Sequence, residues 1–256
     1  MITIPRTARK KSESGIYHII LRGINRQTVF SDDEDRERFI RTLLRYKNIS
    51  GYSIFAYCLM GNHLHLLIKT GAEPLERIMR RICGSYVYWY NKKYERTGNL
   101  FQDRFKSEPV ENDEYLLTVL RYIHQNPVKA GMIRDLSKYK WSSYRDYLGH
   151  TGITDVQFIL NIFNHNRNLA IDNFKKFTGK PNDDRCLEIE EHKKRITDNE
   201  LTEAIENKFK INPAMVKNES SDNLKAIIKE ILNIDGVSTR QLARVTGISP
   251  NIIWKM

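Results

Sequence analysis

Hydrophobic positions along the first half of the chain follow two different spacings. Alternating or continuous apolar runs predict β-strands at 16–23, 52–60, 63–70 and 101–110, and a tight turn at 60–62 joins the second run to the third. These strands are short and separated by more polar stretches, which is typical of a small sheet covered by helices.

Apolar residues recur every three or four positions at 31–48, 73–94 and 113–125, which predicts three helices. Ser31 is expected to cap the first helix. Pro127 is expected to stop the third, because the residue before proline avoids the helical region. The order strand, helix, strand, strand, helix, strand, helix predicts an α+β fold. We expect a ferredoxin-like (split βαβ) antiparallel sheet with its helices on one face.

The second half of the chain is more polar and helical. Helical spacing continues over four segments, at 155–163, 168–177, 196–209 and 222–233. Near the C-terminus, Ser238, Gly247 and Pro250 have the spacing of a helix-turn-helix unit, whose last helix would read DNA. A plain three-helix bundle is the alternative. The sequence ends barely two turns into that last helix, so the completeness of the unit stays open.

The net charge of the chain indicates what kind of partner it binds. The 256 residues include 42 Lys and Arg against 31 Asp and Glu, a net charge of +11. An excess of this size suggests a polyanionic partner, nucleic acid or an anionic membrane surface. No apolar run approaches the 18 or so residues of a membrane span, and residues 1–14 lack the apolar core of a signal peptide.

Cysteine usage points to the compartment. Cys58, Cys83 and Cys186 are odd in number and far apart, so neither a disulfide framework nor a zinc knuckle is indicated. We therefore expect a cytoplasmic protein with reduced thiols.

Two histidines lie in one of the expected strands. His63 and His65 are separated by one residue, so both imidazoles project from one face, while Leu64 and Leu66 point to the core. Two such imidazoles form half of a metal site. A pair of structural histidines is the alternative. The segment contains no Asp or Glu that would complete a metallohydrolase.

Tyr122 lies between apolar positions of the third expected helix. Asn126 follows four residues later and shares its helix face, and Gln125 is almost as close. An amide oxygen from either residue is suited to be a third ligand beside two imidazoles. An ordinary core tyrosine is the competing interpretation.

Basic residues and aromatic rings are interleaved through the same half of the chain. Guanidinium and ammonium groups neutralise phosphates, and rings stack on unpaired bases. Ordinary surface charge is the alternative for part of the set. The candidates for DNA contacts are Arg22, Asn25, Arg26, Arg104, Lys106, Arg121 and Lys129, with Arg240 and Asn251 in the helix-turn-helix-like unit.

Five segments, in the same order, resemble a known family. They are LRGINRQ, GNHLHLLIK, FQDRFKS, RYIHQNPVKAGM and KWSSYRDYLG. The second matches a motif of two histidines around a bulky apolar residue, and the fourth matches a catalytic-tyrosine helix. The chain resembles the single-tyrosine HUH transposases (transposase IS200-like domain), most closely the REP-associated tyrosine transposases. The resemblance covers about residues 14–149.

This resemblance implies cleavage and rejoining of single-stranded or hairpin DNA through a 5′-phosphotyrosine intermediate. It implies Tyr122 as the nucleophile and Asn126, with the two histidines of the GNHLHLLIK segment, as ligands of Mg²⁺ or Mn²⁺. Gln125 competes with Asn126, which precedes a proline. All three ligands are neutral, so the metal keeps its charge for the phosphate, and Mn²⁺ tolerates imidazole better than Mg²⁺ does.

The expected organisation has four parts. A basic flexible arm at 1–14, either a solvated tail or a DNA contact, precedes the HUH nuclease domain at 15–149. A helical connecting region at 150–219 leads to the helix-turn-helix-like unit at 220–256. DNA is the expected partner, without a membrane, and the protein is expected to be a monomer or a homodimer. The alternative function is a non-catalytic, sequence-specific DNA-binding regulator that retains the fold.

Overall fold

The computed structural model describes residues 9–188, 196–234 and 236–254. The chain divides into two compact units, Met1–Ile189 and Glu190–Met256. The expected connecting region at 150–219 is therefore divided between them. Its first two helices, α5 (Val156–Phe163) and α6 (Arg167–Gly179), pack in the first unit, and α7 (Asp198–Phe209) packs in the second.

Four antiparallel strands form the centre of the first unit, in the order β2-β3-β1-β4. They are β1 (Ile16–Arg22), β2 (Ser53–Leu59), β3 (His63–Lys69) and β4 (Lys106–Pro109). The last strand is shorter than the predicted 101–110. Outside β4, Phe101 forms an isolated bridge to Gly23, and the Gln102 and Val110 amides donate to the Arg22 and Ile16 carbonyls of β1.

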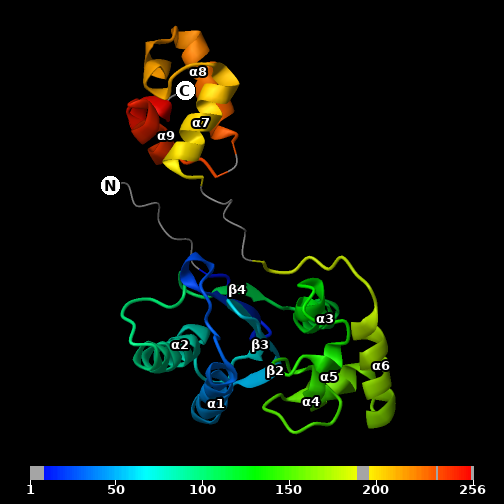
Figure 1. The fold of residues 1–256 in the computed structure, drawn as a ribbon. Coiled ribbons are helices and arrows are strands. Elements are labelled where there is room, and N and C mark those ends of the chain that lie inside the picture. Colours follow the sequence, from blue (N-terminus) through cyan, green and yellow to red (C-terminus); the bar gives the residue numbers. More distant parts are fainter. Residues whose placement is uncertain (1–8, 189–195, 235, 255–256) are drawn as a thin grey trace. The chain divides into compact units, whose positions relative to one another are not determined.

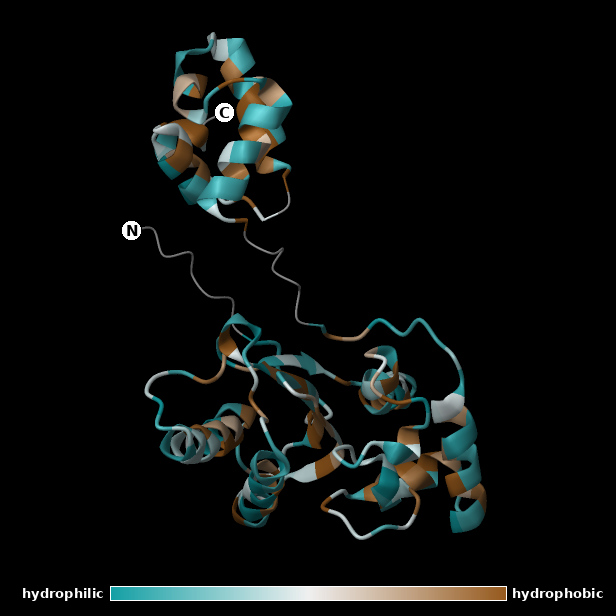
Figure 2. Cartoon of the chain, in the orientation of Figure 1, coloured by the Kyte–Doolittle hydropathy of each residue, from teal (hydrophilic) through white to brown (hydrophobic). Residues whose placement is uncertain are grey.

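Helices cover both faces of this sheet (Figure 1). The long helices are α1 (Asp33–Ser50), α2 (Leu75–Lys93) and α3 (Asp113–Lys129). The prediction that the helices lie on one face is wrong for α3. Alternation along β3 turns Leu64 and Leu66 toward α1 and α2, and turns His65 to the opposite face, where its ring meets Tyr122 of α3. Figure 2 shows hydrophobic residues along the sheet and on the helix sides that face it.

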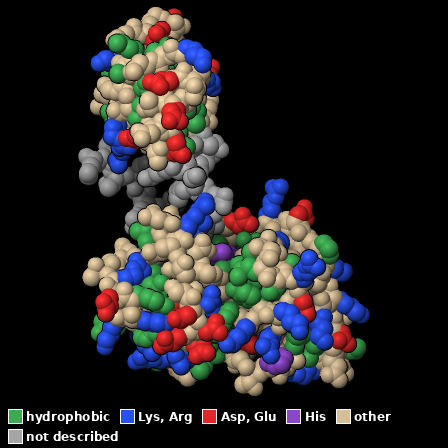
Figure 3. Space-filling view, in the orientation of Figure 1, with side chains coloured by type: hydrophobic (Ala, Val, Ile, Leu, Met, Phe, Trp, Pro, Cys, Tyr) green, Lys and Arg blue, Asp and Glu red, His purple; other side chains and the backbone are tan. Residues whose placement is uncertain are grey.

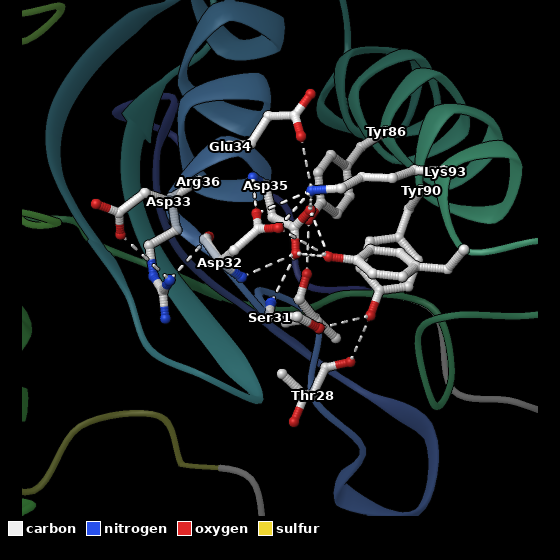
Figure 4. Close-up of polar contacts among 12 residues, drawn as sticks. Thr28, Ser31, Asp32, Asp33, Glu34, Asp35, Arg36, Tyr86, Tyr90 and Lys93 are labelled. Atoms are coloured by element: carbon white, nitrogen blue, oxygen red, sulfur yellow. Dashed lines mark hydrogen bonds and ion pairs between the residues drawn. The ribbon is translucent and has the colours of Figure 1, made fainter.

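An ion cluster joins the start of α1 to the end of α2 (Figure 4). Asp32, not the predicted Ser31, is the N-cap, and it forms a capping box with Asp35. Lys93 Nζ lies 2.7 Å from Asp32, 2.8 Å from Asp35 and 2.9 Å from Glu34. The Asp35 side chain is fully buried, so this cation holds a carboxylate that has no access to water.

Helix α3 continues through Pro127 to Lys129, one turn beyond the predicted end. A proline in the last turn removes only one backbone hydrogen bond. The next bond is intact, because the Ala130 amide donates to the Asn126 carbonyl at 2.9 Å. The extra turn keeps Asn126 in helical register with Tyr122.

Smaller elements complete the first unit. They are the 3₁₀ turns η1 (Ile24–Arg26) and η2 (Leu136–Lys138) and the short helix α4 (Tyr144–Tyr147). Residues 1–8 of the expected arm lie outside the described residues. The part from residue 9 packs on the domain: the Arg9 guanidinium lies 3.9 Å from the centre of the Phe105 ring, and Ser12 and Ser14 bond to Glu111.

The second unit is helical, with its own core around Leu201, Ile228 and Leu242. Besides α7 it contains η3 (Pro213–Asn218), α8 (Ser221–Leu232), α9 (Thr239–Thr246) and α10 (Pro250–Ile253). Ser238 caps α9, and Gly247 has a φ of +72° at its end. No helix in the described ranges is long and apolar enough to cross a membrane.

Candidate active site

The two histidines of β3 lie together on the face that α3 covers. The His63 and His65 ring centres are 5.2 Å apart. His63 Nδ1 is 2.7 Å from Asn62 Oδ1, and His65 Nδ1 is 3.1 Å from His18 Nε2. One nitrogen of each ring is therefore engaged by a neighbour, which leaves the other ring nitrogen of each to face the site.

His18 is a site residue that the sequence analysis missed. It lies on β1, is fully buried, and its ring stacks on His65 at 5.4 Å with 23° between the planes. Its Nδ1 has no hydrogen-bond partner among the described residues. Alternation along β1 places His18 on the same face as Ile20, and Ile20 pairs with His65. Only this register, which joins residues 47 positions apart, reveals the pair.

Tyr122 reaches the histidines from α3. Its ring is 5.5 Å from that of His65 and 5.8 Å from that of His18, both in edge-to-face contact. The side chain is 6% exposed, and its hydroxyl donates to Glu188 at 3.3 Å. Lys129 Nζ lies 5.2 Å from the ring centre. Burial raises the pKa of Tyr122, and the Glu188 charge raises it further, so the phenol is protonated at neutral pH.

Asn126 and Gln125, the two candidate amide ligands, make different contacts. Asn126 donates to the Tyr122 carbonyl at 3.1 Å and hydrogen-bonds with the side chains of His63 and Tyr122. Gln125 points away, donating to the Thr178 and Lys180 carbonyls at 2.7 and 3.0 Å. Asn126 is therefore the amide that the fold brings to the histidines.

The histidines are held neutral. Burial lowers the pKa of His63 to about 4, and the positive charge of Arg22 contributes to this shift. Burial also lowers the pKa of His18 to about 3 and that of His65 well below its usual range. Neutral imidazole is the form that binds metal ions. No three His, Cys, Asp or Glu residues in the described ranges form a metal-holding group, so two imidazoles and an amide are what the site offers.

The segment after α6 crosses α3 beside the tyrosine. Asp184 pairs with Arg121 through two bonds of 2.6 and 2.7 Å, and the Arg121 guanidinium lies 4.3 Å from the centre of the Phe177 ring. Asn182 donates to Gln125 at 2.7 Å, and the Leu187 amide donates to Glu108 at 3.1 Å. Arg121 is therefore paired within the protein, and its contact with DNA stays a prediction.

The other predicted DNA-contacting residues are dispersed. Arg22 lies opposite His63, and Lys106 opposite Ile20, both on the histidine face of the sheet. Asn25 and Arg26 are exposed in η1, each with positive φ. Arg104 is exposed in the loop before β4. In the second unit, Arg240 and Asn251 are exposed at the starts of α9 and α10.

Residues 11–126 match the family model of IS200-like transposases. This part of the chain is similar to that family. The matched range contains both β3 histidines and Tyr122, and it ends at Asn126. The resemblance drawn from the sequence is confirmed over these residues.

Two solved structures are similar to the chain. One is a REP-associated tyrosine transposase bound to a REP hairpin, at 18% identity and a TM-score of 0.49, covering 60% of this chain and 96% of that one. The other is a protein of Deinococcus radiodurans R1 assigned as a transposase, at 18% identity and a TM-score of 0.34, covering 47% and 96%. No curated protein matches the chain significantly in sequence.

Proposed function

We propose that the chain is a metal-dependent, single-tyrosine HUH enzyme that cleaves and rejoins single-stranded or hairpin DNA through a 5′-phosphotyrosine intermediate. The observation that carries the proposal is the meeting of Tyr122 with His63, His65 and Asn126 on one face of the sheet. These residues come from two distant segments, and a purely structural core gives no reason to gather them. The family match over residues 11–126 supports the same chemistry.

The donor set is suitable for Mn²⁺ or Mg²⁺. Both β3 histidines are neutral, each with one ring nitrogen engaged by Asn62 or His18, which orients the other. Asn126 adds an amide group, whose oxygen is a ligand that hard cations accept. A cation bound there would neutralise the charge on the non-bridging oxygens of the scissile phosphate.

The residues of the chain perform the covalent step. The Tyr122 oxygen forms a bond to phosphorus while the bond from phosphorus to the 3′-oxygen breaks. The phenol gives up its proton as it attacks, and the departing 3′-oxygen takes up a proton, so the charge of the two groups balances. Rejoining reverses the step, because the phosphotyrosine ester conserves the bond. The raised pKa of Tyr122 means that this proton transfer needs assistance at neutral pH.

The distribution of charge supports DNA binding by the first unit. Residues 1–189 carry 31 Lys and Arg against 21 Asp and Glu, whereas residues 190–256 carry 11 against 10. Figure 3 shows Lys and Arg side chains over much of the visible face of the first unit. The electrostatic attraction for a polyanion therefore comes from the unit that contains Tyr122.

Two finer assignments belong to the proposal. The strand order β2-β3-β1-β4, with antiparallel neighbours, supports a ferredoxin-like sheet. The Ser238 cap, the left-handed Gly247 and the Ser249–Pro250 start of α10 support a helix-turn-helix unit. The balanced charge of residues 190–256 implies that this unit adds selectivity for a DNA site more than it adds affinity.

A covalent adduct tests the function. With Mn²⁺ and hairpin-flanked single strands from the neighbourhood of its gene, the wild-type chain should retain labelled DNA after denaturing electrophoresis. Tyr122→Phe should form none, and Tyr115→Phe, on the same helix, should form it normally. DNA binding without any adduct would overturn the proposal. If that binding also survived chelation and His63→Ala, the DNA-binding regulator would be the correct reading.

A further inference from the structure

A cavity of about 530 Å³ lies beside the candidate site, between the end of α3 and the end of α6. Lys129 connects the two places, because it lines the cavity and also has its Nζ 5.2 Å from the centre of the Tyr122 ring. We propose that this cavity holds one nucleotide of the DNA strand close to the phosphodiester that Tyr122 attacks. The proposal rests on the proposed function, since it assumes that the strand passes Tyr122.

The charge at the mouth of the cavity suits a phosphate. Lys129 and Arg134 are both exposed there, and neither forms an ion pair with a carboxylate in the described ranges. One acidic residue, Asp135, also lines the cavity, and its Oδ1 accepts from the Ser137 amide at 2.9 Å and the Ser137 hydroxyl at 2.8 Å. The two cations outnumber this carboxylate, so the wall has a net positive charge for a strand.

The interior suits the flat face of a base. Val128, Leu136 and Pro181 contribute apolar surface, and the Tyr144 ring forms part of the lining. The volume lies within the range of pockets that hold small organic ligands. A free phosphate ion would use the cations but none of this apolar surface, which favours a whole nucleotide.

The polar groups of the wall are already used within the protein. Gln125 Oε1 accepts from Asn182, and Gln125 Nε2 donates to the Thr178 and Lys180 carbonyls. Asn182 Oδ1 accepts from the Asp184 amide at 3.1 Å. These bonds make the wall rigid and leave few groups to read the edge of a base. We therefore expect the cavity to accept any of the four bases, by stacking and phosphate contact.

Gly179 provides a way to fill the cavity without straining the fold. It lines the cavity at the end of α6, and a Cβ placed there meets no atom within 4 Å. Gly84, exposed on α2 with equally open space, is the matched control. Arg134→Gln removes one cation, and Arg41→Gln removes an exposed cation from α1, on the other face of the sheet.

The test measures binding of a fluorescent 20-mer of thymidylate, and of the same 20-mer made of abasic residues, to the full chain without divalent metal. Gly179→Phe should weaken thymidylate binding roughly tenfold and remove the preference over the abasic strand. Arg134→Gln should lower the slope of log affinity against log salt by about 0.7. Gly84→Phe and Arg41→Gln should match the wild type.

Normal binding by Gly179→Phe would refute the nucleotide pocket. If Arg134→Gln alone weakened binding, Arg134 would contact a phosphate outside the cavity. An equal loss for both strands also overturns it, because no base would then be held. The proposed function can fail separately. If Tyr122 forms no adduct while Gly179→Phe has the expected binding defect, the nucleotide pocket is supported and the proposed cleavage reaction is refuted.

Discussion

His124 should make the free energy of unfolding of the first unit decrease at acidic pH, because its buried ring resists protonation in the folded state. The ring is 1% exposed and packs edge-on against Tyr144, Tyr147 and Phe174. Its Nε2 bonds to Ser143 Oγ at 2.8 Å, and its Nδ1 has no partner in the described ranges. Burial therefore lowers its pKa from 6.5 to about 3.

The sign of the effect follows from linkage. A group whose folded pKa is depressed favours the folded state above its unfolded pKa, and that contribution is lost as the pH falls from 6.5 toward 3. At pH 5 the unfolded chain has already bound the proton and the folded chain has not. With 1.36 kcal/mol per pKa unit, His124 alone lowers the free energy of unfolding by about 2 kcal/mol between pH 8 and pH 5.

The perturbation is His124→Phe, which keeps an aromatic ring in the cluster and removes the proton site. Urea unfolding of the first unit is followed by Trp89 and Trp141 fluorescence in a Trp254→Phe background, at pH 8 and pH 5. The variant should lose about 2 kcal/mol less than the parent on acidification. His165→Gln, at an exposed position, should behave like the parent. An equal acid loss for His124→Phe and the parent would refute the reasoning.

Two further predictions concern other buried contacts. Lys93→Met should lower the free energy of unfolding of the first unit by about 3 kcal/mol, because it leaves the buried Asp35 carboxylate without its cation. The same urea assay measures this loss. A loss below about 0.5 kcal/mol, which is the value of an exposed ion pair, would contradict the stabilising role of the cluster. His18→Leu should weaken Mn²⁺ binding at least tenfold in calorimetric titration, because His65 loses the partner that orients its ring. His124→Phe is the control there, and unchanged affinity in His18→Leu would contradict the positioning role.

Features that depend on local geometry could be predicted from the sequence. The order of strands and helices follows from apolar spacing, and the shared face of His63 and His65 follows from the two-residue period of a strand. The proximity of Tyr122 and Asn126 follows from the helix repeat in the same way. The Ser238 cap and the left-handed Gly247 were also predictable, because each depends only on adjacent residues.

Errors of the sequence analysis have two causes, misjudged ends of elements and contacts between segments that are distant in the sequence. Helix α3 continues past Pro127 because its last turn keeps its other hydrogen bonds. Pro127 itself is buried. The pairing of Arg121 with Asp184, 63 residues away, was not predicted. Residues 150–179 were assigned to a connecting region, but they pack on α3 and β2 through Phe174 and Asp155.

The sequence by itself therefore determined which chemical groups the chain carries, and which of them lie on one face of one element. Only the tertiary structure decided which faces meet. It placed α3 on the histidine face of the sheet, brought Tyr122 to His65, and paired His18 with His65 across the β1–β3 register. That choice depends on burying apolar surface from segments far apart in the chain, and no local spacing of residues encodes which segments will pack together.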